Sequence, residues 1–284
     1  MYKFGRSGGF LFIFCIFSIY LIAATSSADA APKAKLWPHW QVNLPSSPTI
    51  VDHSAWNSIL GKYVINDAPS GINRFRYAAV TTADRRLLAA YLRKMQSITV
   101  SNLNRQEQKA YWINLYNALT VKVILDHYPV KSIMDIDISP GFFSNGPWDA
   151  KLLKIEGQDV SLNDIEHRIL RPVFKDNRVH YAVNCASLGC PNLQDKAFTS
   201  SNTEQLLKKG AHDFINHPRG VHLRKGRLTV SSIYKWFQAD FGGNEAGVIK
   251  HLQKYADAKL ATTLSKYRAG LKYDYNWQIN EPTK

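Results

Sequence analysis

The sequence predicts an α+β domain in which a buried central helix packs on a mainly antiparallel sheet, with further helices around it. Three observations lead to this class. Helical patterns fill most of the first half of the chain, while strand patterns at hairpin spacing come late. Residues 110–125 are apolar on nearly every face, which is typical of a helix inside a core. The order of elements lacks the regular strand–helix alternation of a parallel sheet.

The expected elements follow in chain order. Helices are expected near residues 53–63, 84–96, 105–127, 161–171, 202–216, 231–239, 245–256 and 258–269. Strands are expected at 74–80, 152–155, 179–184, 221–224, 228–230 and 272–278. The long helix must end before Pro129, which cannot continue a helix. The helix at 161–171 opens on Ser161 and Asp164, a capping-box pattern.

The first thirty residues have the pattern of a secretory signal peptide. Lys3 and Arg6 precede the apolar run FLFIFCIFSIYLIAA, and the small-residue end ADA follows at 28–30. We therefore expect cleavage before Ala31 and a periplasmic or secreted protein. The alternative is an uncleaved anchor, but this run is shorter than the ~20 residues that span a bilayer comfortably. Cys15 lies within this run, so the expected cleavage removes it.

The processed chain is expected to form a leader segment at 31–47, rich in Pro, Ser and Trp, and a single domain at 48–281. Apolar residues make up 45% of the chain and aromatic residues 12%, which speaks for a folded core and against disorder. No later stretch is long and apolar enough to span a membrane.

The chain is strongly basic, with a formal net charge of +14. A basic exported protein is attracted to anionic envelope components, namely phospholipid headgroups, polysaccharide or cell wall. The alternative is a solvated surface with no dedicated partner. The densest basic cluster lies around an expected hairpin at Lys225-Gly226, and no motif for specific nucleic-acid binding accompanies it.

Three polar residues are expected to lie inside the fold. Asn114 and Asn117 are three residues apart on the long helix and so share a face. A buried amide without a partner costs about 1–3 kcal/mol, so both must bond to a nearby group such as a loop backbone. The alternative is a polar face that lines an active cleft. Glu166 points inward on the 161–171 helix without a basic residue four positions later, and is a candidate site residue.

The segment RVHYAVNCASLGCPNL at 178–193 holds the two cysteines that survive processing, Cys185 and Cys190. If 179–184 is a strand, alternate residues share a face. Val179, Tyr181 and Val183 then face the core, and His180 lies on the polar face, as on the floor of a cleft. Cys185 points away from His180 unless the strand ends at residue 184.

Apart from a redox pair, which the lack of Cys-x-x-Cys disfavours, four roles stay open for Cys185 and Cys190. A disulfide is allowed outside the reducing cytosol and is the default expectation; chain-entropy arguments give its small loop roughly 2 kcal/mol. A reactive thiol needs a lowered pKa, from an imidazolium or a helix N-terminus. A zinc site with His180 is disfavoured, because Cys-x4-Cys is not the usual ligand spacing. Two inert buried thiols are the fourth role. No metal or cofactor is predicted.

Five segments in this order resemble one family: EQKAYWINLYNALTV, SLNDIEHRILR, RVHYAVNCASLGCPNL, SSIYKWFQADFGG and LKYDYNWQIN. Together they look like the domain of unknown function 547 family, in an exported bacterial member, over about residues 50–281. The resemblance implies one domain that holds all five segments. It also implies that the family's marked positions are Asn114, Asn117, Glu166, His180, Cys185, Cys190, Trp236 and Asp240. It implies no reaction, because the family's function is unknown.

By analogy alone, the order of elements is similar to that of papain-like and transglutaminase-like thiol enzymes. Those enzymes place their cysteine at the start of the central helix, where this chain reads Arg105-Gln106-Glu107. The sequence therefore leaves open whether the protein is an enzyme. One reading is a non-catalytic envelope binding or structural module with a disulfide-stapled loop. The other is a thiol-dependent hydrolase or acyl-transfer enzyme in which His180 is the base for Cys185 or Cys190, while Glu166 or Asn114 orients the imidazole.

Overall fold

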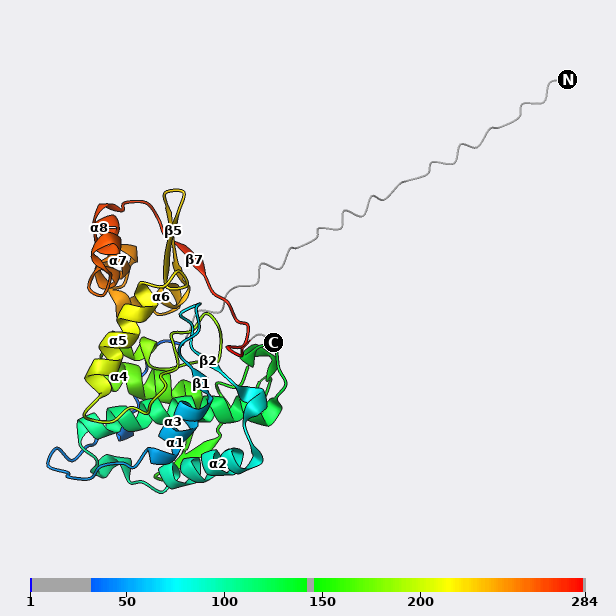
Figure 1. Ribbon diagram of the computed structural model, residues 1–284, viewed down its shortest axis with the longest axis vertical. Helices are drawn as coiled ribbons and strands as arrows, with labels where there is room; N and C mark the ends of the chain where they lie inside the picture. The colour runs from blue at the N-terminus through cyan, green and yellow to red at the C-terminus, as the bar shows by residue number, and fades with distance from the viewer. Residues whose placement is uncertain (2–31, 142–145, 283–284) are drawn as a thin grey trace. The chain divides into compact units, whose positions relative to one another are not determined.

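The computed structural model describes residue 1, residues 32–141 and residues 146–282. The expected cleavage site and the apolar run of the signal peptide lie outside the described residues. The residues from 32 onward belong to one compact unit, Ala31–Lys284. This unit mixes helices with three small sheets, so the α+β class is confirmed (Figure 1). Among the described residues, no helix combines the length and apolar character that a membrane crossing requires.

The helices account for most of the regular structure. The α-helices are α1 (Ser54–Tyr63), α2 (Thr82–Gln96), α3 (Arg105–His127), α4 (Arg171–Phe174), α5 (Thr203–Ile215), α6 (Ile233–Trp236), α7 (Glu245–Gln253) and α8 (Ala258–Lys266). Short 3-10 helices lie at η1 (Pro38–Gln41), η2 (Tyr77–Ala79), η3 (Val100–Asn102), η4 (Ile133–Asp135), η6 (Asn177–Tyr181) and η7 (Gln238–Phe241). A π-helix, η5 (Asp164–Leu170), leads directly into α4.

The strands are short. They are β1 (Val64–Ile65), β2 (Arg74–Phe75), β3 (Leu153–Ile155), β4 (Gln158–Val160), β5 (Val221–Arg224), β6 (Arg227–Ser231) and β7 (Lys272–Asp274). The pairs β1–β2 and β3–β4 are antiparallel, and β6 pairs antiparallel with β5 and parallel with β7. In place of one main sheet against the central helix, the described residues form three separate small sheets.

The central helix α3 has the bounds that the sequence predicts. The Asn104 side chain caps it by accepting a hydrogen bond from the Glu107 backbone N–H, and it ends before Pro129. Its residues from Ala110 to Val121 are all buried. Its main neighbours are the helices α2, α5 and η5, so helix packing rather than a sheet covers this all-round apolar surface.

The leader segment packs on the domain. The backbone N–H groups of Lys35 and Trp37 donate to the carbonyls of His167 and Arg168. Trp40 is buried in the core, edge-on to Trp112 of α3. Residues 32–41 are therefore part of the compact unit.

The expected strand at 179–184 is wrong. Residues 177–181 form the 3-10 helix η6, which begins where the Asp176 side chain accepts the Arg178 backbone N–H. The apolar, β-branched pattern favours a strand by propensity, but the described residues place no partner strand beside it. Instead, η6 packs against α5, where Gly210 lies so close to the Tyr181 carbonyl that a Cβ would approach it to 2.9 Å. Tertiary packing here overrides the local preference.

The C-terminal segment joins the cysteine loop to the rest of the domain. The expected strand at 272–278 is regular only over β7, but its continuation still pairs with the loop. Leu188 and Gly189 donate their N–H groups to the carbonyls of Gln278 and Asn276, and Asn280 donates to the Ala186 carbonyl. These bonds bring the side chain of Tyr275 against the two cysteines.

Candidate functional site

His180 is buried between two carboxylates. It is only 2% exposed. Its Nε2 lies 2.8 Å from Asp240 Oδ2, after α6, and its Nδ1 lies 3.6 Å from Glu166 Oε1 of the π-helix. The Phe237 ring stacks on the imidazole with centroids 4.2 Å apart. His180 thus lies in an aromatic and ionic cluster inside the domain, not on the floor of an open cleft.

Arg171 completes this ionic cluster. Its Nε donates to Asp240 Oδ2 at 2.6 Å, and its Nη1 donates to the Pro32 carbonyl of the leader at 2.7 Å. A second contact joins Nη1 to His167 Nδ1 at 3.0 Å. The leader segment therefore contributes an acceptor to the same buried network that holds His180.

Charge pairing sets the ionisation of the two acids. Burial alone raises the pKa of Glu166, but the neighbouring His167, His180 and Arg171 outweigh it and lower the pKa to about 2. Burial also raises the pKa of Asp240. Hydrogen bonds from His180 and Arg171 outweigh burial and hold this pKa well below its usual range. Both carboxylates are therefore charged at neutral pH.

The two cysteines form a separate hydrogen-bonded group. Cys190 Sγ accepts the backbone N–H of Cys185 at 3.0 Å and the Tyr275 hydroxyl at 3.2 Å. Cys185 Sγ lies 3.1 Å from the Tyr275 hydroxyl and 3.3 Å from Ser187 Oγ. Cys190 is 4% exposed, whereas Cys185 is half-buried. Both are free thiols in the structure, so the disulfide that the sequence favours is not formed in it.

The donors around Cys190 favour its thiolate. Burial raises the pKa of a thiol, but hydrogen bonds from Cys185 and Tyr275 outweigh burial and lower the pKa of Cys190 to about 7. Burial and the adjacent Cys190 sulfur raise the pKa of Cys185 well above its usual value. The pair thus holds one proton tightly and releases the other near neutral pH.

The loop that carries the cysteines is fixed by two asparagines. Asn117 of α3 donates to the Ala182 carbonyl and accepts the Asn184 N–H, both at 2.8 Å. Asn184 in turn donates to the Pro191 carbonyl at 2.7 Å and accepts the Ala186 N–H at 2.8 Å. Ala186, between Cys185 and Ser187, has a φ of 58°, which is strained for a residue with a Cβ.

Asn114 also anchors a loop. Its side chain donates to the Phe198 carbonyl at 2.7 Å and accepts the Phe198 N–H at 2.9 Å. The backbone thus engages the Asn114 amide, as loop anchoring requires, and among the described residues no hydrogen bond joins Asn114 to His180. Asn114 and Asn117 share a face of α3, but they hold two different loops.

The structure separates the candidate residues into two groups. Glu166, His180 and Asp240 meet in the ionic cluster, and Cys185 and Cys190 meet at Tyr275. In the described part of the chain, no hydrogen bond or ion pair joins His180 to either sulfur, because both ring nitrogens face carboxylates. Tyr116 of α3 lies within electrostatic reach of both groups: burial first, then Glu166 and the two thiols, raise the pKa of its hydroxyl.

Sequence reasoning missed three functional neighbours of these groups. Tyr275 lies in the closing segment LKYDYNWQIN and reaches the thiols only because that segment pairs with the cysteine loop. Ser187 lies within the loop, and Arg171 in the capped helix. The closing segment was itself one of the five resembling segments, which was the available signal for Tyr275.

Trp236 lies beside the thiol group rather than the ionic cluster. Its ring contacts Tyr275 and Trp277 with centroids 4.8 and 5.6 Å apart, and Trp148 meets Trp277 at 5.9 Å. All four rings are half-buried. Within residues 32–141 and 146–282, no group of three or more His, Cys, Asp and Glu side chains is arranged to hold a metal ion.

Fold and site together define an α+β domain with a buried histidine–carboxylate cluster and a hydrogen-bonded thiol pair. Residues 100–215 match the model of the family DUF547, a protein family of unknown function. The resemblance to the domain of unknown function 547 family is thereby confirmed over α3, the capped helix and the cysteine loop. None of the curated proteins and none of the solved structures matches the chain.

Proposed function

We propose that the Cys185–Cys190 pair is the functional centre and that the protein acts by thiol–disulfide exchange. The observation that carries this proposal is the environment of Cys190 Sγ, which accepts the Cys185 N–H and the Tyr275 hydroxyl. Thiolate is the reactive form of cysteine, and a thiol with a pKa near ambient pH is the best attacking group. The lowered pKa of Cys190 meets that condition.

The reaction needs a disulfide as its substrate and no histidine base. The thiolate of the pair attacks one substrate sulfur, the S–S bond breaks, and the first product leaves as a thiolate that takes a proton from solvent. The remaining thiol of the pair then loses its proton to solvent and attacks the mixed disulfide. An S–S bond forms between Cys185 and Cys190, and the second product thiolate leaves. The substrate gains two electrons and the pair loses two.

His180 does not support the hydrolase or acyl-transfer alternative. A base must reach the proton that it takes, at about 2.6–3.2 Å or through one water. The two nitrogens of His180 face Asp240 and Glu166 instead. We therefore infer that His180 and Asp240 hold the leader segment and η6 together around Arg171.

A non-catalytic envelope module is the second candidate function. The cysteine loop is bonded on one side to Asn117 and on the other to the C-terminal segment, which suits a structural staple. In that case the disulfide forms once during export and persists. The two candidates differ in whether the disulfide exchanges in the folded protein.

Exchange with oxidised glutathione tests the choice. Wild-type protein, reduced and freed of reductant, is mixed with oxidised glutathione, and intact mass is followed over time at neutral pH. We expect rapid loss of two hydrogens in the wild type, and a trapped glutathione adduct in Cys185→Ser or Cys190→Ser. His180→Gln, if folded, should react at the wild-type rate. A pair that oxidises no faster than glutathione itself, or a disulfide that only denaturant makes reducible, excludes the exchange function and supports the staple.

We also propose that the protein is exported, with cleavage before Ala31. The basic start, the apolar run and the small-residue end support this. N-terminal sequencing of protein from the envelope or medium should begin at Ala31. Retention of the apolar run there would show an anchor instead.

A further inference from the structure

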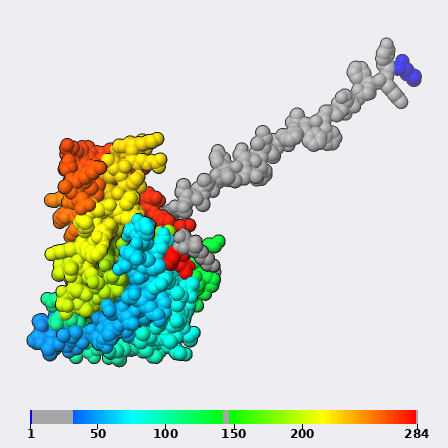
Figure 2. Space-filling model, viewed as in Figure 1, coloured from blue at the N-terminus to red at the C-terminus, as the bar shows by residue number. Residues whose placement is uncertain are grey.

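The hairpin β5–β6 presents a basic end. Lys225 and Gly226 connect the strands with φ angles of 49° and 73°, the two positive values of a type I′ turn. Figure 1 shows this hairpin extending from the three-stranded sheet, and in Figure 2 its atoms form part of the surface at that end of the described unit. Arg224 and Arg227 are cross-strand partners on either side of the turn.

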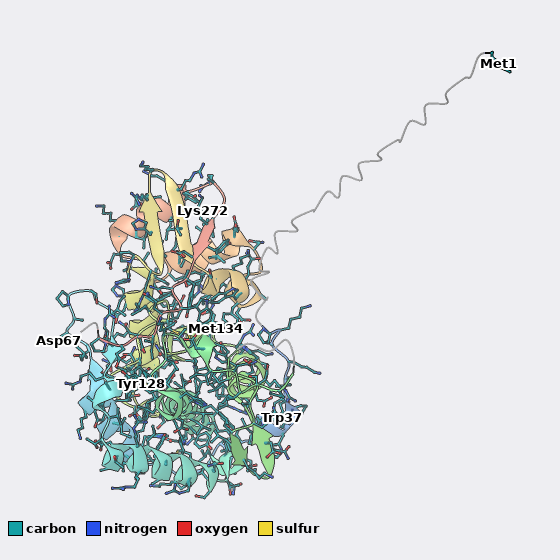
Figure 3. The ribbon with its side chains drawn as sticks, turned by 90° about the vertical axis from the view of Figure 1, so that its right-hand side faces the viewer. Met1, Trp37, Asp67, Tyr128, Met134 and Lys272 are labelled. Atoms are coloured by element: carbon teal, nitrogen blue, oxygen red, sulfur yellow. The ribbon has the colours of Figure 1, made fainter. Side chains whose placement is uncertain are left out.

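The register places the basic residues on one face. Val221 pairs with Val230, and both are buried, so that face of the hairpin meets the core. Arg224 and Arg227 are offset from this pair by an odd number of residues and point to the opposite face. Lys272 of β7 pairs with Thr229 on the same outer face, beside the two strands in Figure 3.

These charges have no acidic partners. Arg224, Lys225, Arg227 and Lys272 are all exposed, and none forms an ion pair with any residue in the described ranges. The one carboxylate on this face of β7 is Asp274, which pairs across to Ser231, four residues from Arg227 along β6. The basic hairpin end, defined as these four residues, therefore carries uncompensated positive charge.

An exposed apolar side chain lies on the inner face of the same hairpin. Leu223 is 44% exposed, although its cross-strand partner Leu228 is buried. Leu223 is next to Arg224 in the chain but points to the opposite face of β5. A hairpin that meets a membrane with its end therefore presents cations on one face and an exposed apolar side chain on the other, which suits anionic headgroups and the acyl region below them.

We infer that the basic hairpin end is a docking surface for anionic phospholipid membranes. The outer face of these strands carries His222, Arg224, Arg227, Thr229 and Lys272 but no Phe, Tyr or Trp, since Tyr273 lies on the other face. Single-stranded nucleic-acid sites typically add stacking rings to their basic surface. This inference is independent of the thiol–disulfide function, because the residues that carry it do not touch the cysteines.

Vesicle sedimentation tests the inference. Wild-type protein is mixed with vesicles of phosphatidylcholine alone and with vesicles of equal parts phosphatidylcholine and phosphatidylglycerol. We expect binding to the anionic vesicles only, and loss of binding as salt rises. The triple variant Arg224→Gln, Lys225→Gln, Arg227→Gln should bind about 100-fold more weakly, since each basic side chain near such a surface contributes about 1 kcal/mol and 1.4 kcal/mol is tenfold.

A matched variant separates local from net charge. Arg86→Gln, Arg93→Gln and Lys208→Gln remove the same charge from exposed positions on α2 and α5. This variant should retain the wild-type affinity, and Leu223→Ser should weaken binding at high salt, where the apolar contact remains. If both triple variants lose the same affinity for anionic vesicles, net charge alone explains the binding and the inference is overturned. Equal binding to both vesicles would also overturn it, as would binding to a soluble uronic-acid polymer with no preference for anionic vesicles.

Discussion

Replacing His180 by alanine tests how the ionic cluster holds the domain. The change removes a ring that contacts Asp240, Glu166 and Phe237 and leaves two charged acids beside a cavity. Leaving a buried charged group without one of its partners costs about 3–5 kcal/mol. Arg171 still pairs with Asp240, so we expect the lower end, about 3 kcal/mol. For a domain of this size that is a fall of roughly 6–12 °C in Tm.

The dependence on pH gives the same reasoning a second readout. Glu166 has a folded pKa of about 2, below its ordinary value of 4.5. Its contribution to stability is therefore fully present above the unfolded pKa and is lost as pH falls through the folded one. The destabilisation by His180→Ala should be full at about pH 7 and should shrink toward about pH 3, where the unpaired acid can take up a proton.

Urea unfolding followed by tryptophan fluorescence measures both effects. His222→Ala is the matched control, because His222 is exposed on β5 and a surface change of this kind costs at most about 0.5 kcal/mol. If His180→Ala lowers the free energy of unfolding by less than about 1 kcal/mol, or by the same amount at both pH values, His180 does not hold the ionic cluster together.

Three further predictions concern the thiol group and its loop. Tyr275→Phe removes a donor to the thiolate, so the pKa of the pair should rise and iodoacetamide labelling at neutral pH should slow about tenfold, while far-UV circular dichroism stays unchanged; an unchanged rate would show that Tyr275 only packs there. Asn117→Ala leaves two loop backbone groups unpaired and should cost about 2–4 kcal/mol by urea unfolding, against no measurable loss for the exposed control Asn102→Ala. Gly189→Ala places a Cβ 2.9 Å from the Asn276 backbone nitrogen and should cost about 1–3 kcal/mol in the same assay; a neutral effect would mean that the C-terminal segment moves freely from the loop.

The sequence by itself determined the elements whose signals are local. The apolar surface of α3, its end before Pro129 and the Ser161–Asp164 capping box need only neighbours in the chain, and all are present. It also determined that Asn114 and Asn117 require hydrogen-bond partners, because an unpaired buried amide is costly whatever the fold; that these partners are loop backbone groups came from the structure.

Only the tertiary structure decided the site. Residues 179–184 could form a strand only beside a partner strand. Residues 177–181 instead form the helix η6, which packs against α5, and His180 is buried there. Asp240 and Glu166 are 74 residues apart in the chain, and no local pattern places both at one imidazole. Tyr275 reaches the cysteines, 85 and 90 residues earlier, through backbone pairing of the C-terminal segment. Long-range pairing of this kind is fixed by the packing of the whole core, and so is the ionisation of the thiols that depends on it.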